Sequence, residues 1–248
     1  MKTGDQGRFR IPMFTVASVS CLLTVTTLSS GKISAAERVE EATVEVSFQH
    51  GVDDYESVVD TEIWELAPKT ILDQNPNASS DENNDGGESQ VLMRFDDIIG
   101  ATQGQVPERA TIVKARLVVS AFDQGTTVNL HRMLVPFEAC STWDSMISGV
   151  SADGYEASRQ KDGFTFGRIS ASSSGAIFDV TDTVQAWANG QPNHGWLFIN
   201  TGGNGWDFYT SQFDKVAQRP KLVVQYRAKP SESSVTSNQD SIAGTSED

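Results

Sequence analysis

Acidic and amide side chains crowd the segment 73–87, whose composition is suited to binding a metal ion. Asp81, Asn83 and Asp85 alternate as the first ligands of an EF-hand loop do. Calcium takes about six to eight oxygen ligands from carboxylates, amides and backbone carbonyls. The remainder of that pattern is missing, because the twelfth position is Leu92 and the sequence predicts no helix on either side. The segment is therefore either a structural Ca²⁺ site or an ordinary disordered acidic loop.

A second group of side chains has the composition of a sugar-binding surface. A pyranose needs an exposed aromatic ring for its apolar face, with amides or charges nearby for its hydroxyls. Trp206 lies in a glycine-rich segment that can present its ring beside Asn204 and Asp207. Trp143 and Tyr209 are the next aromatic candidates. The alternative for each ring is a place in the hydrophobic core.

Basic residues in the predicted strands are candidates for binding an acidic ligand. Lys114 and Arg116 are two positions apart, so a strand places them on one side of the sheet. Together with Arg94 and Arg132 they are predicted to line a basic groove on one sheet face.

The sequence gives little support to catalysis. The three histidines, His50, His131 and His194, lie far apart and lack the spacing of metal ligands. No H-E-x-x-H or G-x-S-x-G motif occurs. Carboxylates are abundant, but a glycosidase-type pair is defined by the distance between its two carboxyl groups. The sequence alone therefore does not identify one. We expect no enzymatic activity.

The segments that must position these residues alternate with a period of two, which is typical of β-strands. About nine strands separated by Gly, Asn, Asp and Pro predict an all-β fold, an antiparallel, jelly-roll-like β-sandwich. One short helix is predicted after Asp179 or Thr181, ending before Gly190, with Trp187 closing one end of the sandwich core. The predicted strands lie at residues 43–48, 61–66, 91–95, 110–122, 127–135, 176–180, 195–199, 206–210 and 222–226.

The two ends of the chain differ from this middle part. Residues 1–36 have the basic start, apolar run and small-residue cleavage site of a secretory signal peptide, with a membrane anchor as the alternative. The folded domain is predicted to span residues 37–228. Residues 229–248 are rich in Ser, Asp and Glu and are predicted to be a disordered acidic tail.

Charge and cysteine content restrict the partners of the exported chain. Removal of residues 1–36 takes away four basic residues and one acid and changes the net charge from −14 to −17. Such a charge disfavours nucleic acid and anionic lipid, and no membrane insertion is expected after cleavage. Cys140 would be the one remaining cysteine, and we expect it to be buried.

Four stretches, in order, resemble the DNRLRE-type domain, which is also classed as carbohydrate-binding module family 96. The resemblance spans nearly all of residues 43–228. The four stretches are Asp60–Ile63 with Val91–Asp96, Val106–Ile112 with Lys114–Leu117, Phe178–Thr181 with Val184, Trp187, Gly190, Gly195 and Trp196, and Thr210–Ser211 with Arg219–Tyr226.

The resemblance implies a β-sandwich in an exported protein, and a polysaccharide ligand that is acidic in some members, such as alginate. We therefore expect a secreted or cell-surface, non-catalytic carbohydrate-binding module. The alternative is an extracellular structural or adhesion module that contacts a cell-envelope protein. A polysaccharide-cleaving enzyme is the third hypothesis.

Overall fold

Period-two patterning produces two antiparallel sheets in the computed structural model, which describes residues 43–165 and 176–227. These residues belong to one compact unit of the chain. The fold is mostly β with one short α-helix, and the two sheets are open and consistent with a β-sandwich. The predicted fold class is confirmed. The predicted signal peptide and the acidic tail lie outside the described residues.

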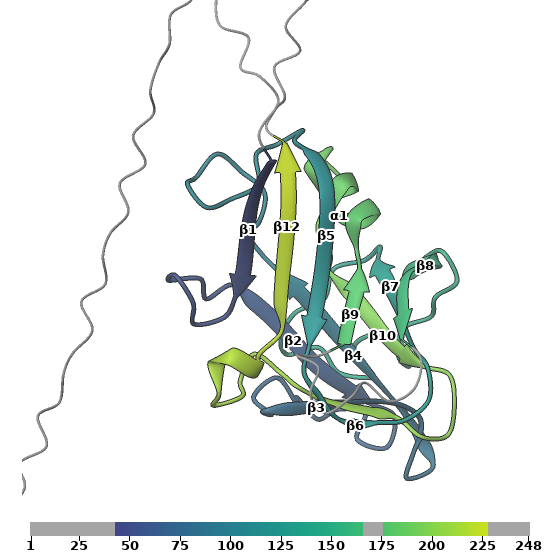
Figure 1. Ribbon diagram of the computed structural model, residues 1–248. Coiled ribbons are helices and arrows are strands. Elements are labelled where there is room, and N and C mark those ends of the chain that lie inside the picture. Colours follow the sequence, from purple (N-terminus) through teal and green to yellow (C-terminus); the bar gives the residue numbers. More distant parts are fainter. Residues whose placement is uncertain (1–42, 166–175, 228–248) are drawn as a thin grey trace, which may run out of the picture. The chain divides into compact units, whose positions relative to one another are not determined.

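The smaller sheet has four strands in the order β1-β12-β5-β9, which lie side by side in Figure 1. Every pairing in it is antiparallel. Its strands are β1 (Thr43–Gln49), β12 (Lys221–Arg227), β5 (Thr111–Val119) and β9 (Ala176–Asp179).

The larger sheet follows the order β6-β11-β3-β4-β10-β7-β8, and β2 pairs with β4 as an eighth strand. Two of these strands, β3 and β8, were not predicted from the sequence, and β6 was merged with β5. The strands are β2 (Val58–Trp64), β3 (Asn77–Asn84), β4 (Gly87–Phe95), β6 (Ala121–Gln124), β7 (Val128–Met133), β8 (Ala157–Thr165), β10 (Trp196–Asn200) and β11 (Trp206–Tyr209).

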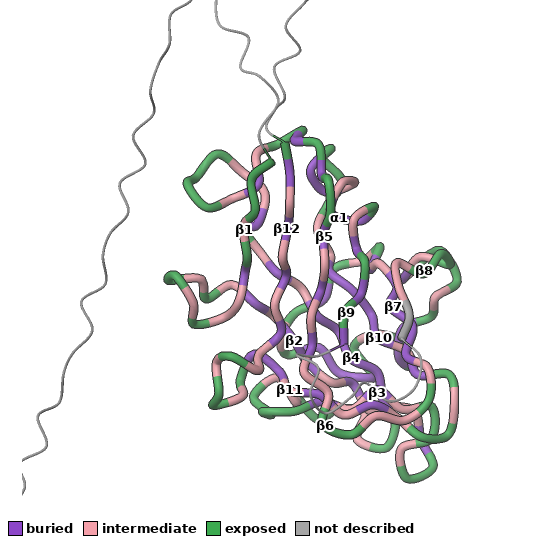
Figure 2. Tube along the Cα trace, viewed as in Figure 1, coloured by how far each residue is buried: buried purple, intermediate pink, exposed green. Residues whose placement is uncertain are grey.

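The main core lies between the two sheets, where buried stretches of the strands face one another (Figure 2). Phe178 of β9 meets Phe198 of β10 edge to face, with ring centroids 5.7 Å apart. Phe198 also contacts Phe208 of β11 at 5.1 Å. Phe198 of β10 thus contacts β9 of the smaller sheet and β11 of its own sheet. Removing its ring would open a cavity where these three strands meet.

The outer face of the larger sheet is covered as well. Leu92 and Leu197 alternate with the residues of the main core and point to the other side of β4 and β10. Phe137, Trp143 and Val150, from the connection between β7 and β8, pack over them. Burial on both faces explains the unbroken apolar runs in these two strands.

The helix α1 (Thr181–Ala188) buries Trp187, which packs on Trp196 at 4.7 Å. The Asp179 carboxylate accepts a hydrogen bond from the Thr181 backbone N–H (3.1 Å) at its start. Gly190, with φ +95°, ends the helix in the left-handed conformation that favours glycine. The predicted helix and the core position of Trp187 are confirmed, and among the described residues no helix is long and apolar enough to cross a membrane.

We predict that Phe198→Ala lowers the free energy of unfolding by about 3–5 kcal/mol, the range for loss of a buried phenyl ring. Ile177 of β9 is 55% exposed, so Ile177→Ala serves as the control and should change it by about 1 kcal/mol or less. Chemical denaturation measures both. Equal losses in the two variants would contradict this assignment of the core.

Candidate functional site

The larger sheet carries a polar pocket of about 330 Å³ at its β6-β11-β3 end. Four carboxylates and four amides line it, together with one serine and one glycine. This polar pocket consists of Glu62, Asn75, Asn77, Ser79, Asp81, Asn84, Asp123, Asn204, Gly205 and Asp207. Its volume falls within the range of about 300–1,000 Å³ that is usual for ligand sites.

Strand register explains why these polar side chains meet. Asp207 of β11 lies directly opposite Ser79 of β3 on one side and Asp123 of β6 on the other. Because side chains alternate along a strand, Trp206 and Phe208 point to the opposite side, into the main core. Burial of the two rings on one side of β11 therefore places Asp207 in the polar pocket on the other side.

Glu62 reaches the polar pocket from β2. Its carboxylate oxygen Oε2 accepts a hydrogen bond from the Ser79 backbone N–H at 2.9 Å. The Ser79 side chain in turn hydrogen-bonds the Asp207 carboxylate. One residue of β3 thus links two acidic groups that are far apart in the sequence.

These carboxyl groups are held in an unfavourable environment for charge. Burial raises the pKa of Glu62 from 4.5 to about 7. The hydrogen bond from Ser79 opposes this shift, and the nearby charge of Asp207 adds to it. Burial also raises the pKa of Asp207, as do the charges of Asp123 and Asp81. Among the described residues, none of the four pocket carboxylates forms an ion pair with a Lys, Arg or His side chain. The polar pocket is therefore rich in acceptors and short of cationic partners.

The glycine-rich connection between β10 and β11 brings Asn204 to the rim. The Thr126 backbone N–H donates to the Asn204 carbonyl at 2.8 Å. A Cβ atom at Gly205 would lie 2.5 Å from the Asp81 Cβ, so a larger residue there would collide with the polar pocket wall. The predicted roles of Asn204 and Asp207 at a polar site remain compatible with their positions, since the structure brings both to this pocket.

The prediction that Trp206 presents its ring to a ligand is wrong. The side chain is 1% exposed, and its indole N–H donates to the Thr126 carbonyl at 2.6 Å. Its pairing with Ser80 places it on the core side of β11, opposite to Asp207. Trp143 is also buried, packed over the outer face of the larger sheet. Cys140, expected to be buried, is exposed.

From Asn77 onward the acidic segment is not a loop. It forms the β3–β4 hairpin, turned by Asp85 (φ +55°) and Gly86 (φ +101°), the two positive angles of a type I′ turn. Asp81 lies in the polar pocket, where its Oδ1 accepts the Asn83 N–H at 2.9 Å, while Asp85 is in the turn. Within residues 43–165 and 176–227, no group of three His, Cys, Asp or Glu side chains is arranged to hold a metal ion. The calcium prediction receives no support from this part of the chain.

The predicted basic groove is not formed. Arg94 and Arg132 belong to the larger sheet, whereas Lys114 and Arg116 belong to β5 of the smaller one. Lys114 and Arg116 do share the outward side of β5, as expected. Each has an acidic neighbour: Lys114 Nζ lies 4.0 Å from Asp179, and Arg116 lies 3.9 Å from Glu45.

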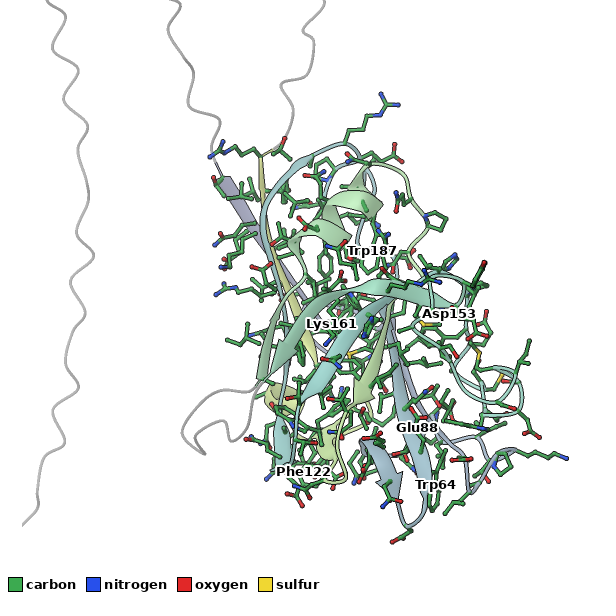
Figure 3. All side chains as sticks on the ribbon, turned by 90° about the vertical axis from the view of Figure 1, so that its right-hand side faces the viewer. Trp64, Glu88, Phe122, Asp153, Lys161 and Trp187 are labelled. Carbon is green, nitrogen blue, oxygen red and sulfur yellow. The ribbon has the colours of Figure 1, made fainter. Side chains whose placement is uncertain are left out.

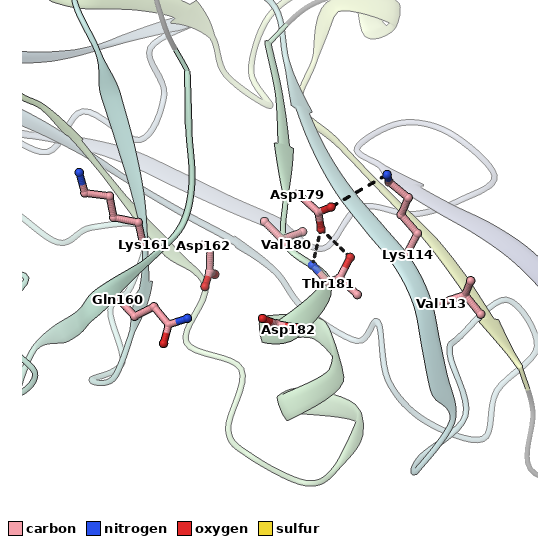
Figure 4. Close-up of a pocket in the computed structure, with 9 residues that line it drawn as sticks. All are labelled: Val113, Lys114, Gln160, Lys161, Asp162, Asp179, Val180, Thr181 and Asp182. Carbon is pink, nitrogen blue, oxygen red and sulfur yellow. Dashed lines mark hydrogen bonds and ion pairs between the residues drawn. The ribbon is translucent and has the colours of Figure 1, made fainter.

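Lys114 also lines a second hollow, of about 380 Å³, beside the start of α1 (Figure 4). Lys161 and three aspartates contribute to it, so it presents charges of both signs. Asp162 is held there by the Trp196 indole N–H at 2.8 Å and by the Thr183 hydroxyl. These bonds anchor β8 to the core, which is a structural role. The polar pocket is the better candidate for ligand binding.

The fold and the polar pocket define the chain as an all-β protein with an amide- and carboxylate-lined pocket at one end of its larger sheet. No protein-family model matches the chain, and no curated protein is significantly similar to it. The resemblance to DNRLRE-type domains therefore stays a proposal.

Sequence analysis pointed to the segment 73–87, which contains Asn75, Asn77 and Asn84, but not to Glu62 or Asp123. Asn77 and Asn84 lie at the ends of the unpredicted strand β3. The Asp85-Gly86 dipeptide, a strong hairpin signal, would have revealed this strand. For Glu62 no local signal exists, because its partner Ser79 is reached only through the fold.

We predict that Glu62→Gln changes how stability depends on pH. The folded pKa of Glu62 exceeds its ordinary value, so the native state holds this proton more tightly and stability falls as pH rises from about 4.5 to about 7. The glutamine keeps an acceptor for the Ser79 N–H and does not ionise. At pH 8 its Tm should exceed that of the wild type by about 2–4 °C, the shift that ~1 kcal/mol gives in a domain of this size.

The difference between the two melting curves should disappear near pH 4, where Glu62 is protonated in both states. Asp60 is buried with a pKa of about 6, so it contributes the same dependence of stability on pH in both proteins and serves as an internal control. Melting profiles that stay parallel from pH 4 to pH 8 would contradict the assigned environment of Glu62.

Proposed function

We propose that this chain is a non-catalytic carbohydrate-binding protein whose ligand is a neutral polysaccharide bound at the polar pocket. The observation that carries the proposal is the union of carboxylates and amides in one hollow of ligand size. Carboxylates accept hydrogen bonds from sugar hydroxyls, and amides both donate and accept. A small number of such groups around a pocket is what fixes the orientation of a polar ligand.

The charge of the polar pocket selects among polysaccharides. Its ten lining residues include no Lys, Arg or His. A uronic acid there would meet like charges, which costs several kcal/mol at an interface. The proposal therefore departs from the acidic ligand that the family resemblance implies for some members.

Export fits this proposal, because an extracellular polysaccharide is reached by a secreted or cell-surface protein. The argument for export rests on residues 1–36, which resemble a secretory signal peptide. We propose that residues 37–228 act as a DNRLRE-like module of such a protein.

We predict that Asp207→Asn weakens binding of neutral polysaccharides by about tenfold or more, the loss expected when a hydrogen bond to a charged acceptor is removed. Asn77→Ala should weaken it less, because Asn77 is exposed at the pocket edge. Depletion assays with β-glucan, galactan and xylan, and with alginate as the acidic comparison, measure the effect.

Asp144→Asn is the matched control, since Asp144 is exposed and lies outside the polar pocket. It should bind like the wild type. Asp207→Asn removes a crowded charge, so its Tm should not fall, and weaker binding would not reflect unfolding. Binding of alginate in preference to every neutral polymer would contradict the proposal.

One observation favours a hydrolase as the second candidate. Glu62, with a pKa raised to about 7, lies in the same pocket as a second carboxyl group, that of Asp207, and a raised pKa is one property of a glycosidase acid. The binding proposal predicts no release of reducing ends from any bound polymer over a long incubation. Release that stops in Glu62→Gln would replace the binding proposal with hydrolysis.

A further inference from the structure

A row of three aromatic rings continues the polar pocket along the same side of the sheet. Phe122 and Tyr209 have ring centroids 4.8 Å apart, and Tyr209 stacks on Phe213 at 3.7 Å with an interplanar angle of 14°. Phe122 is 46% exposed, whereas Tyr209 and Phe213 are half-buried. We call these three side chains the aromatic row.

A β-bulge accounts for the exposure of Phe122. Asp207 pairs with Asp123 and Phe208 pairs with Ala121, so Phe122 is the extra residue of β6. A bulge places two residues of one strand opposite one residue of its neighbour and redirects a side chain. Regular alternation would point Phe122 and Asp123 to opposite sides; the bulge lets Phe122 meet Tyr209 on the pocket side. Figure 3 shows Phe122 at the end of the molecule remote from Trp187.

The aromatic row adjoins the polar pocket through β11 and β3. Tyr209 follows Asp207 by two positions, which puts both on one side of β11 about 7 Å apart. Tyr209 also pairs with Asn77, a pocket residue. The two surfaces are thus continuous, and together they extend beyond a single pyranose ring.

From this arrangement we infer that the aromatic row is a second sugar subsite, and that the ligand is a chain of at least two neutral pyranose units. One unit stacks its apolar face on the exposed Phe122 ring, while the neighbouring unit places its hydroxyls in the polar pocket. This inference rests on the proposed function.

The chemistry of the two surfaces identifies this ligand class. The aromatic row offers ring faces and edges, which bury apolar C–H surface. The polar pocket offers carboxylate and amide groups for hydroxyls. A pyranose chain presents an apolar ring face and hydroxyl groups side by side, which a purely apolar ligand does not. Units with equatorial substituents, as in β-1,4-linked glucose, have the flattest such face.

The test measures affinity against chain length. Titration calorimetry with β-1,4-linked gluco- and galacto-oligosaccharides of one to six units should show wild-type affinity rising by about tenfold or more from one unit to the longer chains. Phe122→Ala should remove most of that rise and leave the affinity for one unit unchanged. Phe122→Trp, which keeps an aromatic face, should retain it.

Two controls keep the outcomes distinct. Phe122 is half in solvent on an edge strand, so its alanine variant should keep the wild-type Tm within a few degrees. Tyr155→Ala removes a ring that is 77% exposed elsewhere and should not alter binding.

Undiminished length dependence in Phe122→Ala would overturn the second subsite while leaving the proposed function intact. Failure of the wild type to bind any member of either series would overturn both. Binding of one unit that weakens equally in Phe122→Ala would also refute the inference, since it would place the ring in the primary pocket.

Discussion

The polar pocket depends on the burial of Trp206 and Phe208 on the opposite side of β11. Both rings are about 1% exposed, and Phe208 contacts Phe198 in the centre of the core. A shift of one residue in the pairing of β11 would carry these rings into solvent and Asp207 into the core, so burial specifies the register strongly. The same register places Asp207 between Ser79 and Asp123. Hydrophobic packing therefore holds together carboxylates that would otherwise separate.

The arrangement has an energetic consequence. Burial raises the pKa values of Glu62 and Asp207, and the charges of neighbouring carboxylates raise them further. Among the described residues, none of the four pocket carboxylates forms an ion pair with a basic side chain. Sites that bind ligands are commonly less stable than the fold allows, because groups arranged for a partner are poorly satisfied without it. Here the Ser79 hydrogen bonds limit the cost, and a ligand rich in hydroxyl groups would satisfy the remaining acceptors. On the smaller sheet, by contrast, Lys114 and Arg116 each lie close to an acidic side chain, so their charges are already paired.

The sequence alone predicted the fold better than the site. Alternating apolar residues in β1, β5 and β12 determine the sandwich, and Gly190 marks the helix end, because these signals are local. Strand β3 was missed since its residues, Asn77–Asn84, include no large apolar side chain, and only the small Ala78 and Ser80 face inward. Trp206 was misplaced because its glycine-rich neighbours resemble a loop. The site could not be assembled from the sequence, since the contact between Glu62 and Ser79 arises from packing and not from spacing along the chain.

The central claim is that the end of the larger sheet formed by β3, β6 and β11 recognises neutral sugar. Backbone amide NMR spectra recorded during titration with a soluble neutral oligosaccharide test it most directly (Figure 2 labels the three strands). The account predicts that the largest shift changes fall in residues 75–81, 122–124 and 204–209, with β1 and β12 unaffected. Changes concentrated instead on the outward side of the smaller sheet, around Lys114 and Arg116, would contradict it.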